Sequence, residues 1–335
     1  MQERLVFLIS PPRSGSTLLQ RMLGSHADVL SPPEPHLLTP LAYLGFHDRV
    51  DRAPYDAINS AEALRLYVRR LPRGEEDYLD ALRAYADTMY GRLLESSGRK
   101  LLLDKTPAYA TVLPFVTRLY PRARYVVLTR HPLAVFASYA NSFFEGRWEE
   151  AHRYNPIVER YVPPIARLIR ERAVPLLHVR YERLVAEPEA ELRGLFEFLR
   201  LPHDPRAVDY GERFSGPSDG PGDPIGVGRH RRPTTASVHR WATEVATDPA
   251  KRTLARRMID ALSDDDLEAW GEPRRTLWEP LERAGAPRPA SRVVNGYTLQ
   301  RRVLLALRKD VHRRPHGALL ERIRYYCDVI LRDTL

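Results

Sequence analysis

The strongest constraint on the fold is a short apolar run near the N-terminus that is followed by a polar break and then by a helical pattern. Leu5–Ile9 is continuously apolar and of strand length, and such runs are typical of strands covered on both faces. Residues 10–16 (SPPRSGS) interrupt the pattern, and residues 17–23 (TLLQRML) resume with helical spacing. The chain therefore opens with a predicted strand, loop and helix.

A second unit of the same kind follows about 115 residues later. Residues 124–128 (RYVVL) predict a strand, residues 129–132 (TRHP) a loop, and the pattern from Pro132 to Asn141 a helix, with Pro132 in its first turn. Further strands are predicted at residues 100–103 and 175–179, and further helices at 78–94, 110–119 and 189–199. This alternation predicts an α/β fold, a P-loop-like parallel sheet flanked by helices.

The C-terminal part of the chain has a different composition. Residues 214–232 are rich in Gly and Pro and predict a long surface loop. After a Pro-rich joint at residues 284–290, residues 299–311 and 317–331 have amphipathic helical patterns. We therefore expect a catalytic domain at residues 1–270 and a basic helical C-terminal extension at residues 271–335.

The net charge of the chain is concentrated in that extension. The formal net charge is +9, and residues 270–335, with 14 basic and 7 acidic side chains, carry +7 of it. A solvated helical surface and a contact surface for an acidic partner both fit this pattern. A non-enzymatic polyanion or nucleic-acid binder is the alternative of another class, and it is disfavoured because aromatic side chains do not interleave with the basic ones.

Some classes of protein are excluded by composition. The single cysteine, Cys327, excludes a disulfide framework and a cysteine-built zinc site. No cluster of His, Asp and Glu has metal-ligand spacing, so no metal is expected. No apolar segment is long enough to span a bilayer, and the N-terminus lacks a basic region followed by a long apolar run. We expect a soluble, cytoplasmic protein.

Residues 10–17 have the character of an anion-binding loop, because backbone N–H groups and the helix dipole at such a junction attract negative charge. Arg13 adds a forked donor, and Gly15 allows close approach of the backbone. Hydroxyl groups come from Ser14, Ser16 and Thr17. A loop for nucleoside triphosphates would have Gly in place of Ser10 and Lys in place of Ser16, so a kinase or ATPase is disfavoured. A Gly/Ser turn that only caps a helix is the structural alternative.

Two motifs together carry a resemblance to a known family. Residues 12–19 (PRSGSTLL) resemble the 5′-phosphosulfate loop of sulfotransferases that use 3′-phosphoadenosine-5′-phosphosulfate (PAPS). Residues 125–132 (YVVLTRHP), continuing to Ser138, resemble the 3′-phosphate site of the same family. The resemblance implies that Arg130 and Ser138, eight residues apart, hold the 3′-phosphate.

Further segments extend the resemblance over about residues 4–245. Residues 104–107 (DKTP) resemble the family's Lys-x-Pro element, and residues 179–184 (VRYERL) resemble its Tyr-Glu-x-Leu segment, which implies that Tyr181 binds the nucleotide. Residues 31–38 (SPPEPHLL) resemble the curacin-type sulfotransferase domains of bacterial polyketide assembly lines, which sulfate a β-hydroxyl of a carrier-bound acyl chain. Residues 234–241 (TTASVHRW) resemble that group's nucleotide-covering segment. Ser142 departs from the basic residue of some relatives, and the C-terminal extension matches no known element.

The resemblance implies metal-independent, in-line transfer of the sulfuryl group of PAPS to a hydroxyl, with PAP as the coproduct. Such a reaction needs positioning and charge stabilisation. Arg13, the loop amides and Lys105 are the candidates for stabilising the bridging oxygen, where negative charge grows in the transition state.

The acceptor hydroxyl also needs a general base. Glu34 is the first candidate, because tyrosyl-type sulfotransferases carry a catalytic Glu on the corresponding segment. His230, in the Gly-rich loop, is the second, and His36 and His131 are weaker candidates. The expected acceptor is an acyl or polyketide chain on a carrier protein, which is typically acidic and would be attracted to the basic extension. A free small molecule, a lipid or a glycan is the alternative.

Overall fold

The computed structural model describes residues 1–44, 46–47, 55–213 and 231–284, without the side chains of residues 55–59. Several features singled out in the sequence lie outside these residues. They are most of the Gly-rich segment (214–230), both helical stretches predicted at 299–311 and 317–331, His230 and Cys327.

The described residues form one five-stranded sheet in the order β2-β3-β1-β4-β5, and every pairing is parallel. The strands are β1 (Leu5–Ile9), β2 (Val29–Leu30), β3 (Leu101–Asp104), β4 (Arg124–Thr129) and β5 (Leu176–Arg180). The register sets Phe7 beside both Asp104 and Tyr125, so β1 lies centrally between β3 and β4. The predicted α/β fold and four of its strands are confirmed. β2, with two residues, is too short to leave a pattern in the sequence.

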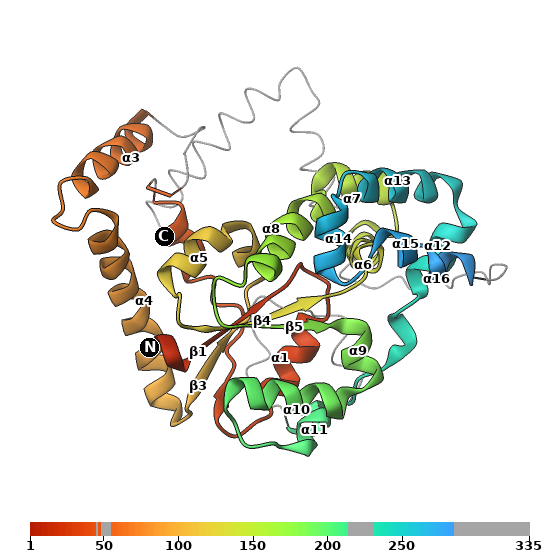
Figure 1. Cartoon of the computed structure of the whole chain (residues 1–335), viewed down its shortest axis with the longest axis horizontal. Coiled ribbons are helices and arrows are strands. Elements are labelled where there is room, and N and C mark those ends of the chain that lie inside the picture. The colour runs from red at the N-terminus through yellow and green to blue at the C-terminus, as the bar shows by residue number, and fades with distance from the viewer. Residues whose placement is uncertain (45, 48–54, 214–230, 285–335) are drawn as a thin grey trace.

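Helices cover both faces of the sheet (Figure 1). The described α-helices are α1 (Ser16–Gly24), α2 (Leu38–Ala42), α3 (Tyr55–Val68), α4 (Glu75–Ser97), α5 (Leu113–Leu119), α6 (Pro132–Phe144), α7 (Trp148–Tyr154), α8 (Ile157–Glu171), α9 (Tyr181–Ala186), α10 (Pro188–Leu199), α11 (Tyr210–Arg213), α12 (Arg240–Thr247), α13 (Pro249–Asp260), α14 (Asp264–Trp270), α15 (Arg274–Leu277) and α16 (Glu279–Glu282). Short 3₁₀ helices are η1 (Gln2–Arg4), η2 (Pro107–Val112), η3 (Pro205–Val208) and η5 (Thr235–Ser237).

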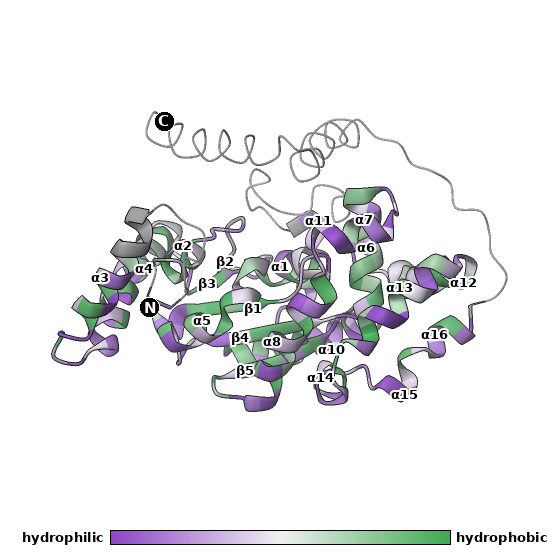
Figure 2. Cartoon of the chain, turned by 90° about the horizontal axis from the view of Figure 1, so that it is seen from above, coloured by the Kyte–Doolittle hydropathy of each residue, from purple (hydrophilic) through white to green (hydrophobic). Residues whose placement is uncertain are grey.

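The alternating side chains of β1 divide the core into two clusters. Leu5, Phe7 and Ile9 pack with residues of α4, α5, α6 and α8, whereas Val6 and Leu8 pack with residues of α1, α9 and α10. All five side chains are buried. The strands are accordingly coloured mostly as apolar in Figure 2, whereas the helices around them carry both polar and apolar residues. A strand covered on both faces has to be apolar throughout, as the Leu5–Ile9 run is.

One predicted helix, at residues 110–119, differs in the structure. The 3₁₀ helix η2 occupies its beginning, and the α-helix α5 starts only at Leu113. Pro114 explains the break, because an α-helix through residue 110 would need an N–H at position 114, which proline lacks. Proline is instead well placed in the first turn of α5.

The first residues of the predicted C-terminal extension fold as α15 and α16. Leu277 on α15 is fully buried and belongs to the same core cluster as α6 and α14. The division into domains at residue 270 stays a prediction. In the described residues, no helix combines the length and apolar character that crossing a membrane requires.

Candidate active site

The predicted site residues meet at the carboxyl edge of the sheet. The 10–17 loop follows β1, Lys105 follows β3, Arg130 follows β4 and Tyr181 follows β5. The chain runs from β1 towards β2 on one side of the sheet and from the neighbouring β4 towards β5 on the other side. Open parallel sheets bind their ligands at such a point.

Gly15 shapes the loop that follows β1. Its φ is +92°, and a Cβ at this position would lie 2.5 Å from Cδ2 of Tyr181, so only glycine fits. Ser10 and Ser14 are fully buried, and neither Oγ has a hydrogen-bond partner among the described residues. α1 begins directly after the loop, and its first backbone N–H groups lack partners within the helix. The loop therefore offers donors to an anion.

Arg130 is the centre of the second predicted anion site, and 7% of its surface is exposed. Its Nη2 donates to the carbonyl of Ser237 at 2.9 Å, and its guanidinium lies 4.3 Å from the ring centroid of Tyr181. Burial lowers its pKa from the ordinary value of arginine. Its buried Nε has no partner in the described part of the chain, which fits a donor that is arranged for a ligand such as phosphate.

Arg13 joins the two anion sites. Its Nε donates to Oγ of Ser138 on α6 at 3.4 Å, and its carbonyl accepts from Nη1 of Arg130 at 3.3 Å. The structure thus brings the loop after β1 and the Arg130–Ser138 pair together, although more than 115 residues separate them in the sequence. The remaining loop residues, Ser16 and Thr17, form the first turn of α1.

Lys105 and Glu34 form an ion pair on the β3 side of the loop. The Lys105 side chain is 1% exposed, that of Glu34 is 15% exposed, and Nζ donates to Oε1. The second carboxylate oxygen lies 3.5 Å from Nε2 of His36. The segment that carries Glu34 is attached to α1, because Nε2 of Gln20 donates to the carbonyl of Pro32 at 2.8 Å.

Tyr161 on α8 interacts electrostatically with Glu34 of this ion pair. Burial raises the pKa of Tyr161 on α8, and the nearby Tyr43 and Glu34 add to the increase. Tyr161 is buried, whereas Tyr43 and the neighbouring Leu44 are each more than two-fifths exposed.

His131 follows Arg130 directly, and its ring has its own set of contacts. Its Nδ1 accepts from the N–H of Leu133, its Nε2 lies 2.9 Å from the carbonyl of Leu277, and its ring stacks on Trp241 with centroids 4.2 Å apart. Burial lowers its pKa to about 4. These contacts describe a neutral imidazole that caps α6 and attaches α15 to the domain.

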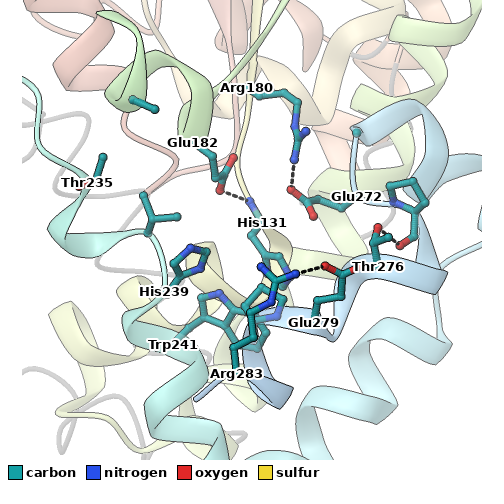
Figure 3. A pocket seen from close by; sticks show the side chains of 15 residues that line it. His131, Arg180, Glu182, Thr235, His239, Trp241, Glu272, Thr276, Glu279 and Arg283 are labelled. Atoms are coloured by element: carbon teal, nitrogen blue, oxygen red, sulfur yellow. Dashed lines mark hydrogen bonds and ion pairs between the residues drawn. The ribbon is translucent and has the colours of Figure 1, made fainter. Parts of the chain in front are cut away.

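A pocket of about 660 Å³ opens next to His131. Its wall includes Glu182, whose carboxylate accepts from the N–H of His131 at 2.9 Å, and the ion pair of Arg180 with Glu272 (Figure 3). Arg13, Glu34 and Lys105, which were predicted for catalysis, do not line this pocket, whereas His131, a weaker candidate for the base, does. Among the described residues, no group of three or more His, Cys, Asp or Glu side chains is arranged to hold a metal ion.

Ser237 is a site residue that the sequence did not single out. Its Oγ lies 2.8 Å from the hydroxyl of Tyr181, and its carbonyl accepts from Arg130. The only sequence signal for it is its place in the 234–241 segment, which resembles a nucleotide-covering segment. The second candidate base, His230, lies outside the described residues.

Comparisons with known proteins agree with this geometry. A family model described as the sulfotransferase family matches residues 6–205. Nodulation protein NoeE of Sinorhizobium fredii is 30% identical over 233 residues, which are 61% of this chain and 51% of that protein, so the chain spans about half the length of this relative. The solved sulfotransferase domain of the Synechococcus PCC 7002 olefin synthase is 27% identical, with a TM-score of 0.52, over 80% of this chain and 93% of that one.

The sulfotransferase domain from the curacin biosynthetic pathway also matches, with 24% identity and a TM-score of 0.49 over 76% of this chain and 96% of that one. The family model over residues 6–205 confirms the family resemblance read from the two anion-binding motifs. The chain belongs to the sulfotransferase family.

Proposed function

We propose that this chain transfers the sulfuryl group of PAPS to an acceptor hydroxyl, and that the acceptor is the β-hydroxyl of an acyl or polyketide chain on a carrier protein. The observation that carries the proposal is the meeting of three groups at one sheet edge. These are the loop with Arg13, the Arg130–Ser138 pair, and the Lys105–Glu34 ion pair.

The residues divide into a nucleotide-binding set and a reacting set. Arg130 and Ser138 would hold the 3′-phosphate, since a guanidinium matches phosphate geometry, and Tyr181 would contact the nucleotide. The 10–17 loop, with its unpartnered Ser10 and Ser14 hydroxyls, would bind the 5′-phosphosulfate.

The reaction forms one S–O bond and breaks another. The acceptor oxygen attacks sulfur, the bond from sulfur to the bridging oxygen breaks, and PAP leaves with the electron pair. Arg13 and Lys105 would stabilise the charge that develops on the bridging oxygen. Glu34 would take the proton of the hydroxyl, using the carboxylate oxygen that Lys105 does not bind. His230 remains the alternative base.

Two observations support a carrier-bound acceptor. The olefin synthase domain, a part of a larger synthase by its name, shares 27% identity and the fold with this chain. Residues 270–335 carry a net charge of +7, which suits an acidic partner.

The test offers sulfur-labelled PAPS to the purified chain with three kinds of acceptor. These are a β-hydroxyacyl carrier protein, the same acyl group as a free pantetheine thioester, and simple alcohols. Preferential labelling of the carrier protein supports the whole proposal. Labelling of free acceptors alone overturns the carrier-protein part of the proposal. If the chain does not bind PAP but binds generic DNA in a salt-dependent way, the assignment as an enzyme is overturned in favour of a polyanion binder.

A further inference from the structure

Asp104, the residue before Lys105, is the centre of a buried network of hydroxyl groups. Asp104 is fully buried. Its Oδ2 accepts from the hydroxyls of Tyr90 at 2.6 Å and Tyr109 at 3.0 Å, and its Oδ1 accepts from Thr106 at 2.8 Å. Burial raises the pKa of this carboxyl group, while the three O–H donors oppose the increase. So many donors around one buried carboxylate fix its position closely.

Tyr109 differs from the other donors because its hydroxyl also bonds to the backbone of another segment. Its hydroxyl also accepts from the backbone N–H of Leu38 at 3.1 Å, and both residues are fully buried. Leu38 is the first residue of α2 and follows Glu34 by four positions, whereas Asp104 directly precedes Lys105. One hydroxyl therefore connects the segment of the carboxylate with the segment of the ammonium group.

We infer that Tyr109 is a positioning residue for sulfuryl transfer, and that its hydroxyl keeps Glu34 and Lys105 at the separation of an ion pair. This inference rests on the proposed function, since it assigns the ion pair a part in the reaction. Misplacement of a reacting group by about 1 Å can cost roughly 10²-fold in rate, so this link is expected to govern kcat more than nucleotide binding.

The chain offers a matched pair of variants. Tyr109→Phe removes the hydroxyl that joins the two segments. Tyr90→Phe removes a hydroxyl that is bound to the same Asp104 oxygen and interacts with the Tyr109 hydroxyl, but that has no bond of its own to Leu38. Both substitutions keep the ring. Tyr109→Phe deletes the hydrogen bonds to Asp104 and to the N–H of Leu38, whereas Tyr90→Phe deletes the one to Asp104. Because kcat is measured per PAP-binding site, a role confined to stability predicts no loss of kcat for either variant.

The experiment measures kcat for the carrier-bound acceptor per PAP-binding site, so that unfolded molecules are not counted, together with the KM for PAPS and the Kd for PAP. Tyr109→Phe is expected to lower kcat by roughly 10–100-fold with KM and Kd within about twofold of the wild type. Tyr90→Phe is expected to keep kcat within about threefold. Equal kcat values for the two variants overturn the inference.

A second measurement needs no acceptor and separates this inference from the proposed function. In crystal structures of the two variants, the Lys105–Glu34 separation is expected to exceed about 4 Å, the limit for an ion pair, in Tyr109→Phe only. An intact pair in Tyr109→Phe overturns the inference even if no acceptor is found. A separated pair supports it, whereas an inactive wild-type chain counts against the proposed function alone.

Discussion

Lys105 and Glu34 form an ion pair across 71 residues of sequence, with the ammonium group 1% exposed and the carboxylate 15% exposed. Lys105 directly follows a central strand, and Glu34 lies on the segment that α1 holds through Gln20. A buried charge needs such a partner, because an unpaired one is strongly destabilising. The pairing places a carboxylate and a cation of the proposed reaction side by side.

Glu34→Gln is the first prediction. Glutamine keeps the volume and one oxygen of the side chain but cannot accept the proton of a hydroxyl, so kcat should fall by about 10²–10⁴-fold. Affinity for PAP should change little, because Glu34 is not among the nucleotide-binding residues. Steady-state kinetics and calorimetry with PAP measure the two effects.

Glu95→Gln, on the exposed face of α4, is the matched control and should retain full activity. If Glu34→Gln turns over at the wild-type rate, His230 becomes the preferred base.

Gly15→Ala is expected to damage both stability and nucleotide binding. The new Cβ would need a φ of +92° and would lie 2.5 Å from the Tyr181 ring, so the loop or the ring has to move. Strain of this kind costs about 1–3 kcal/mol, measured as the change in free energy of unfolding in urea. Binding of PAP should weaken in parallel.

Gly194→Ala is the matched control for this change. Gly194 lies within α10, and a Cβ there meets no atom within 4 Å. Alanine should raise the free energy of unfolding by roughly 0.5–1 kcal/mol, since glycine is a poor helix former. A Gly15→Ala variant as stable and as tightly PAP-binding as the wild type would contradict the close contact between the loop and Tyr181.

The central strand–loop–helix units could be predicted because their signals are local. Each signal lies within about ten residues of sequence. These signals are the apolar run Leu5–Ile9, the proline at the start of the 132–144 helix, and the loop residues around Gly15. The 110–119 segment shows the limit of such signals, since the helical pattern continues through Pro114 although the backbone hydrogen bonds do not. β2, with two residues, exists only through its pairing with β3.

The contacts that build the site are long-range, and here the sequence was informative only in part. Arg13, Glu34, Lys105, Arg130 and Tyr181 were singled out one by one, from motifs. Nothing in the sequence indicated that Arg130 would bind the carbonyl of Ser237, or that the Tyr109 hydroxyl would join two segments. Backbone carbonyls and buried hydroxyls acquire such partners only through the tertiary fold, so no residue pattern encodes them.

Arg130→Lys should remove the preference for a 3′-phosphate. The guanidinium donates to two carbonyls and stacks on Tyr181, and an ammonium group cannot reproduce these contacts while also reaching a phosphate. Charge-assisted hydrogen bonds contribute about 1.5–3 kcal/mol, so affinity for PAP should fall by roughly 10–100-fold. Affinity for adenosine 5′-phosphate, which lacks the 3′-phosphate, should fall much less.

Calorimetric titrations with the two nucleotides measure this difference. Arg206→Lys, on the exposed side of η3, is the control with the same change in chemistry and should bind both nucleotides like the wild type. An equal loss of affinity for both nucleotides would place Arg130 elsewhere than at the 3′-phosphate.

The pH dependence of stability provides the last prediction, through His131. Burial lowers its pKa from 6.5 to about 4, so the folded state keeps the imidazole neutral while the unfolded state takes up a proton between these values. Stability from this group is therefore complete above pH 6.5 and is lost as the pH falls towards 4, by roughly 3 kcal/mol. Burial also lowers the pKa of His178 to about 4, so His178 affects stability over the same pH range. The contribution of His131 is therefore measured by comparing a variant with the wild type.

In His131→Asn the amide can still accept from the N–H of Leu133 as a helix cap, but it does not titrate. Urea unfolding between pH 4.5 and 7.5 should show a lower stability at neutral pH and a shallower decline on acidification for this variant. Parallel curves for the variant and the wild type would contradict a neutral, buried His131.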